Sequence, residues 1–207
     1  AMVKRALYNW PESKAGKLSL EKARHTCIGA CVGSYIPYET GHPVEGQPNL
    51  GKILELALND GFDPRTKKQV GPKSGDPETF KTFEDVYAAF EKQLQYCEEV
   101  LRRGAWIASM LAAEYLPVTW RSVLTNGCIE SGVDVWHGGA NYYTVAQISV
   151  GQVDAGNGLM AIKDQIYDKK KLTWAELKVA LAANFEGEYE RVHKMLYVDA
   201  PKYGNNI

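Results

Sequence analysis

The sequence predicts a helix-rich α/β fold, and three observations support this prediction. Two apolar-periodic stretches with capping residues, 50–61 and 82–116, have the spacing of amphipathic helices. A third helical pattern follows Thr173 and continues towards Pro201. Between these helices, a β-branched and aromatic stretch near 142–148 is typical of a strand. We therefore expect mostly helices with a few short strands.

The first part of the chain predicts one short helix and one long loop. The segment LSLEKARH, which ends at His25, reads as a short helix. Residues 26–49 are rich in Gly, Pro and Tyr and lack helical periodicity, so they are expected to form a loop. Asn49 then caps the helix LGKILELALNDG, and Gly61 supplies its stop.

The rest of the chain alternates connections and helices. Residues 62–80 contain three prolines and three lysines, which predicts an exposed, turn-rich connection. A capping pattern at Thr82 opens the long helix that Pro117 ends. After the expected strand, the next helix should begin near Leu159, and Thr173 should cap the one after it.

Composition places the chain among ordinary folded proteins. Of its 207 residues, 45% are hydrophobic and 24% charged, which predicts one domain with a real core. The net charge of -1 provides no basic field for a phosphate backbone, so nucleic acid is not an expected partner. No apolar run approaches the ~20 residues that span a bilayer, and the first residues lack the apolar core of a signal peptide. We expect a cytoplasmic protein with no membrane partner.

The four cysteines, at positions 27, 31, 97 and 128, are too few for a disulfide framework. Cys27 and Cys31 are spaced like ligands of an iron-sulfur cluster, but Ser34 occupies the next ligand position. No histidine has zinc-ligand spacing to a cysteine pair. We therefore expect thiol chemistry with no metal and no bound cofactor.

Three polar residues, Glu130, Asp134 and His137, lie close together in the segment CIESGVDVWHGGANY. A histidine beside carboxylates suits general acid and base catalysis. The favoured alternative is that these side chains bind backbone groups of a tight glycine turn.

From Cys31 onward the chain contains an ordered series of motifs. They are the loop ACVGSYIPYETGHPVEGQPN, the turn G-x-D-P-x-T-x-x-Q-x-G-P-x-x-G-D-P, and the segments GCIESGVDVWHGGANY, GNGLMAIKDQIYDKKKLTWAELKVALAANFEG and APKYGNN. Together they resemble the middle of a glycyl radical enzyme of the pyruvate formate-lyase family. The resemblance implies that residues 1–207 are a single segment of a ten-stranded α/β barrel. The N-terminal half of the barrel and the C-terminal R-V-x-G-Y radical site would be absent.

The resemblance also implies a chemistry. In that family a glycyl radical, installed by an activating enzyme that uses S-adenosylmethionine and an iron-sulfur cluster, takes hydrogen from a cysteine at a loop tip. The resulting thiyl radical attacks the substrate. Cys31 matches this cysteine by its place in the motif. Cys128, in a literal C-x-E, is a rival, but its segment matches the downstream landmark instead.

The implied partners are a small-molecule substrate, the activating enzyme and, for a split enzyme, a second chain with the radical site. We expect a homodimer in the full enzyme.

Two departures from the family pattern narrow the expected reaction. Family members that eliminate water carry C-x-E, whereas this chain has Cys31-Val32-Gly33. Members that add hydrocarbons to fumarate are expected to keep a basic residue in this loop, yet no Lys or Arg occurs between Cys31 and Leu50. The expected activity is therefore a radical lyase that cleaves a C–C or C–heteroatom bond, such as a decarboxylase or a formate-lyase-like enzyme. Candidates for the missing base are Glu39, His42 and Glu45.

Two alternatives stay open. One is radical addition to fumarate, as in aryl- or alkylsuccinate synthases. The other is a catalytically inert structural remnant or binding subunit.

Overall fold

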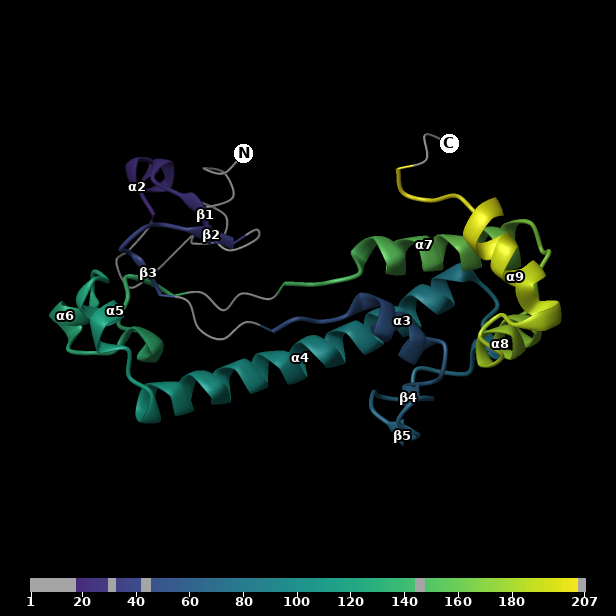
Figure 1. Ribbon diagram of the computed structural model, residues 1–207, viewed down its shortest axis with the longest axis horizontal. Coiled ribbons are helices and arrows are strands. Elements are labelled where there is room, and N and C mark those ends of the chain that lie inside the picture. Colours follow the sequence, from purple (N-terminus) through teal and green to yellow (C-terminus); the bar gives the residue numbers. More distant parts are fainter. Residues whose placement is uncertain (1–17, 30–32, 42–45, 144–147, 205–207) are drawn as a thin grey trace. The chain divides into compact units, whose positions relative to one another are not determined.

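The computed structural model describes residues 18–29, 33–41, 46–143 and 148–204 (Figure 1). The chain divides into two compact units. Unit 1 comprises residues 1–46 and 101–148, and unit 2 comprises residues 47–100 and 149–207. Among the described residues, no helix is both long enough and apolar enough to cross a membrane.

Unit 2 is mainly helical. Its elements are the helices α3 (Leu50–Ala57), α7 (Gln152–Ile162), α8 (Trp174–Ala182) and α9 (Glu190–Lys194), the 3₁₀ turns η1 (Pro77–Thr79) and η4 (Gly187–Tyr189), the π-helical turns η3 (Lys163–Asp168) and η5 (Met195–Asp199), and the strands β4 (Phe62–Asp63) and β5 (Lys68–Gln69). The helix α4 (Phe83–Tyr115) begins in unit 2 and continues into unit 1 beyond Val100.

One apolar core joins the helices of unit 2. It contains Ile53 of α3, Val86 of α4, Leu159 of α7, Leu177 of α8 and Val192 of α9, all of them buried. Burying an aliphatic side chain of this size contributes about 1.5–3 kcal/mol each to folding. Packing, rather than helix propensity alone, therefore holds these short helices in place.

The connection between α3 and α4 is largely exposed, as predicted, but hydrogen bonds with residues before and after it hold the stretch 72–75 in place. The Asp60 carboxylate accepts hydrogen bonds from the backbone N–H groups of Ser74 and Gly75, at 2.6 and 2.7 Å. The buried Gln93 amide donates to the Pro72 carbonyl at 2.6 Å and to the Ser74 hydroxyl at 2.9 Å. Strands β4 and β5 form an antiparallel pair in the same connection. Composition indicates turns correctly but does not reveal such long-range hydrogen bonds.

Unit 1 contains the residues on both sides of the predicted cysteine loop. Its elements are the helices α2 (Leu20–Arg24), α5 (Thr119–Val123) and α6 (Cys128–Ser131), the 3₁₀ turn η2 (Val135–His137), and the strands β1 (Cys27–Gly29), β2 (Gly33–Tyr35), β3 (Thr40–Gly41) and β6 (Tyr142–Tyr143). Strands β1 and β2 pair antiparallel, and β3 and β6 pair parallel. The buried side chains of Leu18, Ala23, Ile36 and Tyr142 form a small core.

Most predicted helices are confirmed. Helix α3 follows its Asn49 cap, whose side chain accepts from the Lys52 N–H at 3.1 Å. Helix α4 ends before Pro117. Helix α8 follows Thr173, whose hydroxyl accepts from the Glu176 N–H at 3.2 Å.

Two predictions are wrong. Residues 26–49 were expected to form a loop, but they contain the short strands β1, β2 and β3. Helix α7 begins at Gln152, well before the expected start near Leu159. Its glycines hid the helical signal, and packing explains one of them. A Cβ on Gly158 would lie 2.8 Å from Leu54 Cδ2 of α3, so the glycine permits the two helices to approach closely.

The expected strand near 142–148 is represented by β6, and residues 144–147 lie outside the described part of the chain.

Candidate functional site

The candidate site is the surroundings of the predicted cysteine loop in unit 1. Cys31, His42 and Glu45 lie outside the described residues, whereas Glu39 lies within them. The strands on either side of Cys31 are register partners, with Cys27 opposite Tyr35 and Gly29 opposite Gly33. The residues directly before and after 30–32 therefore belong to two paired strands.

Cys27 is exposed on β1, and the described residues contain no group of three His, Cys, Asp or Glu side chains that would hold a metal ion.

A tight turn follows β2 and presents Glu39. The Thr40 hydroxyl accepts from the Ile36 N–H at 2.9 Å and donates to the Ile36 carbonyl at 3.1 Å. Tyr38 has a φ of +63°, in the left-handed region that non-glycine residues seldom adopt. The parallel pairing of β3 with β6 begins immediately after the turn, and the Tyr142 N–H donates to the Glu39 carbonyl at 3.0 Å. Backbone contacts on both sides thus fix the position of Glu39.

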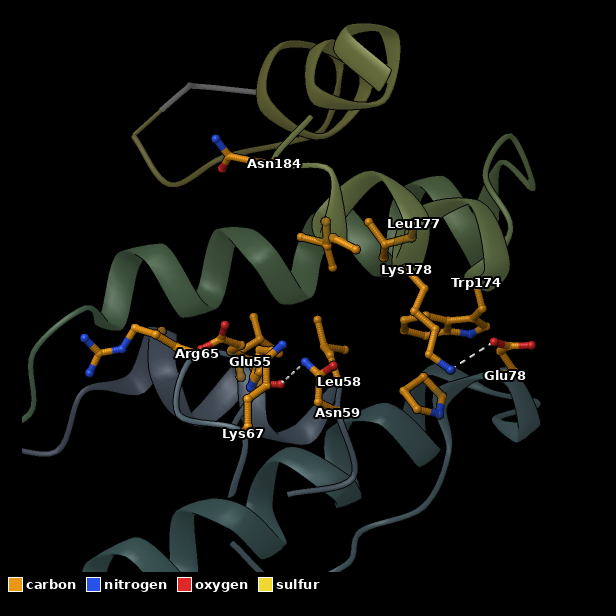
Figure 2. Close-up of a pocket in the computed structure, with 16 residues that line it drawn as sticks. Glu55, Leu58, Asn59, Arg65, Lys67, Glu78, Trp174, Leu177, Lys178 and Asn184 are labelled. Carbon is orange, nitrogen blue, oxygen red and sulfur yellow. Dashed lines mark hydrogen bonds and ion pairs between the residues drawn. The ribbon is translucent and has the colours of Figure 1, made fainter. Parts of the chain in front are cut away.

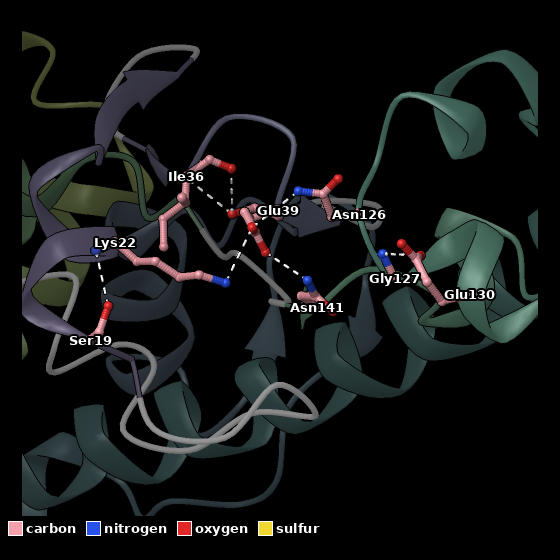
Figure 3. Close-up of polar contacts among 9 residues, drawn as sticks. Ser19, Lys22, Ile36, Glu39, Asn126, Gly127, Glu130 and Asn141 are labelled. Carbon is pink, nitrogen blue, oxygen red and sulfur yellow. Dashed lines mark hydrogen bonds and ion pairs between the residues drawn. The ribbon is translucent and has the colours of Figure 1, made fainter.

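The Glu39 side chain joins three separate segments of unit 1 (Figure 3). Its Oε1 accepts from Lys22 Nζ of α2 at 3.2 Å and from Asn126 Nδ2 at 3.1 Å. Its Oε2 accepts from Asn141 Nδ2 at 2.7 Å. Only 15% of the side chain is exposed. We call Lys22, Glu39, Asn126 and Asn141 the Glu39 network.

The network keeps Glu39 ionised. Burial alone would raise the pKa of this carboxyl group, but the hydrogen bonds from Asn141, Asn126 and Lys22 outweigh burial and lower the pKa below its ordinary value of 4.5. A carboxylate with a lowered pKa and occupied oxygens is a poor proton acceptor. Its geometry is that of a group that holds other segments in place.

Gly127 allows the two asparagines to approach each other. It has a φ of +94°, and a Cβ there would lie 2.7 Å from both Asn141 Oδ1 and the Gly139 carbonyl oxygen. The Asn141 N–H also donates to the Asn126 carbonyl at 3.1 Å, and the Asn126 N–H donates to the Tyr38 carbonyl at 2.7 Å. Because any other residue at 127 would be strained and would clash, glycine is required for the network.

The rival motif around Cys128 has a structural role. Cys128 is the first residue of α6 and is buried against Val135 and Ala140. Glu130 of the C-x-E triplet accepts from the Gly127 N–H at 2.8 Å, which caps the same short helix. The Asp134 carboxylate accepts from the N–H groups of Val118 and Trp136, at 3.1 and 2.8 Å. Glu130 and Asp134 thus bind backbone groups, as expected, but those groups belong to Gly127, Val118 and Trp136 and not to the predicted glycine turn.

Unit 2 contains a separate cavity of about 880 Å³ (Figure 2). Apolar side chains line much of it, among them Leu58, Trp174 and Leu177. At one end the Lys178 ammonium group donates to the Glu78 carboxylate at 3.0 Å. Glu39 and the strands β1 and β2 belong to the other unit.

Both the sequence and the fold match known proteins. A model of the family described as pyruvate formate lyase-like matches residues 7–207. The chain belongs to this family.

Three known proteins illustrate the similarity. Trans-4-hydroxy-L-proline dehydratase of Clostridioides difficile is 38% identical over 93% of this chain and 24% of its own. Its crystal structure with trans-4-hydroxy-L-proline bound gives a TM-score of 0.86 at 39% identity, with the same coverage of 93% and 24%. The glycerol-bound structure of the B12-independent glycerol dehydratase from Clostridium butyricum gives a TM-score of 0.87 at 31% identity. This match covers 100% of this chain and 25% of the dehydratase chain. Indoleacetate decarboxylase of Tractidigestivibacter scatoligenes is 29% identical over 91% of this chain and 24% of its own.

These similarities confirm the resemblance to glycyl radical enzymes and the expected fold class, a helix-rich part of an α/β barrel with few short strands. The chain spans about a quarter of the length of its relatives, 24% for the hydroxyproline dehydratase.

Sequence reasoning missed three members of the Glu39 network: Lys22, Asn126 and Asn141. Their only signal was that Asn126 directly precedes, and Asn141 lies near the end of, the segment GCIESGVDVWHGGANY that resembles a family landmark. Lys22 carried no signal, because a lysine in a short helix is ordinarily solvated.

Proposed function

We propose that this chain is the cysteine-loop segment of a glycyl radical lyase that acts on a small organic substrate, with Cys31 as the thiyl residue. The observation that carries the proposal is the family match over residues 7–207, which includes Cys31. The antiparallel pairing of β1 and β2 supports it, because paired strands hold the two ends of the segment that contains Cys31.

Cys31 would exchange one hydrogen atom at each step. Its thiol first loses a hydrogen atom to the glycyl radical, which becomes an ordinary glycine. The Cys31 thiyl then takes a hydrogen atom from the substrate, which restores the S–H bond and leaves a substrate radical. That radical breaks a bond and becomes a product radical. The product radical takes a hydrogen atom back from the Cys31 thiol, which regenerates the thiyl and completes the cycle.

Two bond cleavages are candidates, and each has its own support. Dehydration is supported by the hydroxyproline and glycerol dehydratases; the substrate radical would release water formed from its hydroxyl group and one of its own protons. Decarboxylation is supported by Gly33, which replaces the Glu expected in dehydratases, and by indoleacetate decarboxylase. In that case the hydrogen atom would be taken from a carboxyl group, which then loses carbon dioxide. Addition to fumarate is less favoured, because no Lys or Arg occurs between Cys31 and Leu50.

Of the three candidate bases, Glu39 is the least suited to accept a proton, because three hydrogen bonds and a lowered pKa stabilise its ionised form. His42 and Glu45 are therefore the preferred candidates for proton transfer.

The remaining components are also proposals. The radical glycine would come from another part of the enzyme or from a second chain, and an activating enzyme with S-adenosylmethionine and an iron-sulfur cluster would install the radical. The complete enzyme is proposed to be a homodimer.

A substrate panel tests the proposal. The activated enzyme, kept free of oxygen, is incubated with trans-4-hydroxy-L-proline, glycerol and indoleacetate, with Cys31→Ala as the background. We expect loss of water or of carbon dioxide from one compound class, detected by mass spectrometry, and no product with Cys31→Ala. Product formation by Cys31→Ala would contradict the proposal. A full glycyl radical signal without turnover across a broader panel of alcohols and carboxylates would favour an inert remnant.

A further inference from the structure

We propose that Glu39 is a positioning residue for the predicted cysteine loop: its carboxylate ties the chain before the loop and the chain after it to the segment 126–141. The inference rests on the proposed role of Cys31. It adds a residue that acts on the hydrogen transfer without touching the substrate.

The network reaches both ends of the loop. Lys22 lies in α2, directly upstream of β1, and Glu39 lies in the turn directly downstream of β2. The ion pair between their side chains, at 3.2 Å, therefore links a residue before β1 to a residue after β2, outside the β1–β2 pair. The Lys22 ammonium group also lies 5.6 Å from the centre of the buried Tyr142 ring, which restricts it further.

The downstream segment supplies a firm anchor. Asn126 and Asn141 lie on either side of α6 and η2, and both donate to Glu39. Backbone hydrogen bonds from the Asn126 N–H to the Tyr38 carbonyl and from the Tyr142 N–H to the Glu39 carbonyl join the same two segments. Because side-chain and backbone hydrogen bonds both join the Glu39 turn to the segment 126–141, this part of unit 1 is held rigidly. Rigidity matters here because the rate of hydrogen transfer between a radical and a thiol depends steeply on the distance between them.

Swapping the carboxylate of residue 39 and the amide of residue 141 can distinguish a positioning role of Glu39 from a role in proton transfer. In E39Q, the amide oxygen can still accept from Lys22 and Asn126, but the amide NH₂ group then faces the NH₂ group of Asn141. In E39Q/N141D, the amide of residue 39 donates to the new carboxylate of residue 141, which restores the hydrogen bond with its direction reversed. A base at position 39 is absent from both variants.

The measurement is solvent exchange at the radical glycine, which needs no substrate. In D₂O the Cys31 thiol becomes S–D. When hydrogen moves back and forth between this thiol and the glycine, the α-hydrogen of the glycyl radical is replaced by deuterium. The α-hydrogen splits the electron paramagnetic resonance signal of the glycyl radical, so the decay of this splitting over time gives the exchange rate. The samples are the activated full enzyme, E39Q, E39Q/N141D, C31A and E130Q, with unfolding midpoints measured for each.

We expect exchange to slow by about tenfold or more in E39Q, since a small misplacement of reacting groups has effects of this size. Exchange should recover in E39Q/N141D and stay unchanged in E130Q, the matched control, because Glu130 caps α6 locally. Normal exchange in E39Q would overturn the inference. So would slow exchange that the swap leaves slow although the double variant is as stable as E39Q, because the restored hydrogen bond between residues 39 and 141 would then not position the loop.

If the double variant has a lower unfolding midpoint than E39Q, slow exchange in it could come from its lower stability. In that case the single variant N141A tests the inference. It removes the 2.7 Å hydrogen bond but keeps Glu39, and it must slow exchange for the inference to stand. Failure of the proposed function gives a different result, because C31A would then exchange as fast as the wild type.

Discussion

Lys52 binds two carboxylates that differ in their exposure to solvent. It donates to Asp63, whose side chain is 6% exposed, and to Glu55, whose side chain is 42% exposed. Asp63 also accepts from the Arg65 N–H and the Thr66 hydroxyl, at 3.0 and 2.7 Å. The hydrogen bond from Lys52 and then the one from Thr66 hold the pKa of Asp63 well below its ordinary value of 3.8.

This difference gives a prediction about stability. Asp63→Asn should lower the unfolding midpoint by about 4 °C or more, because it leaves Lys52, Thr66 and a backbone N–H with a weaker acceptor. The matched control Glu55→Gln, at the exposed end of the same lysine, should lower it by less than about 2 °C. Thermal unfolding followed by circular dichroism measures both. Equal shifts of the unfolding midpoint in the two variants would show that the buried Asp63 contributes no more to stability than the exposed Glu55.

The same residue predicts the response to acid. The folded state lowers the pKa of Asp63, so its stabilisation is complete above the unfolded value of 3.8 and is lost as the pH falls towards the folded value. The wild type should therefore lose stability steeply below about pH 4, and Asp63→Asn should lose less over the same range. Denaturant titrations from pH 3 to 7 test the difference in slope, and parallel curves would exclude the mechanism.

At this scale the sequence predicts residues with local partners well. Asn49 and Thr173 act as caps because a cap needs only a side chain and an N–H group a few residues away. The Glu39 network was missed because its partners Asn126 and Asn141 are brought to Glu39 only by the fold. Cys31, His42 and Glu45 stay predictions.

At the scale of elements, two glycines in α7 separate packing from helix propensity. A Cβ on Gly156 would meet nothing within 4 Å, whereas one on Gly158 would lie 2.8 Å from Leu54 Cδ2. Gly156→Ala should therefore raise the free energy of unfolding by about 0.5–1 kcal/mol, the usual gain in a helix interior.

Gly158→Ala should show little or none of this gain, because the Leu54 side chain must move away from the new methyl group. Denaturant unfolding of the two variants checks the contrast. An equal gain at both positions would mean that α3 and α7 do not pack as described.

These glycines also explain why the start of α7 was not predicted. Sequence patterns treat glycine as a helix breaker, and they contain no information about a neighbouring helix that requires a small residue. The strands β1 to β3 were missed for a related reason. They are only two or three residues long, so they show no alternation, and pairing with another strand defines them.

At the scale of the whole molecule, the last third of α4 and helix α5 expose large apolar side chains. Trp106 is 60% exposed, Tyr115 68% and Trp120 77%. Exposed large apolar side chains are common on surfaces that contact other protein. The relatives are about four times longer than this chain, which covers 24% of the hydroxyproline dehydratase.

We therefore predict that the purified chain alone binds a hydrophobic dye and self-associates. Trp106→Gln and Trp120→Gln should reduce both effects without lowering the unfolding midpoint. Tyr203→Gln, which changes a still more exposed aromatic residue in unit 2, should reduce neither. Dye fluorescence and light scattering after size exclusion provide the readouts. A strictly monomeric chain without dye binding would contradict the prediction.

The central claim, that Cys31 carries the radical to the substrate, is tested most directly by the turnover of two serine variants in the activated, oxygen-free enzyme. Cys31→Ser should abolish turnover, because an oxygen radical is far harder to form from a serine hydroxyl than a thiyl is from a thiol. Cys128→Ser should retain most activity, because Cys128 packs against Val135 and Ala140 and its replacement costs only about 1–3 kcal/mol of stability. Turnover by Cys31→Ser, or its loss only in Cys128→Ser, would contradict the claim.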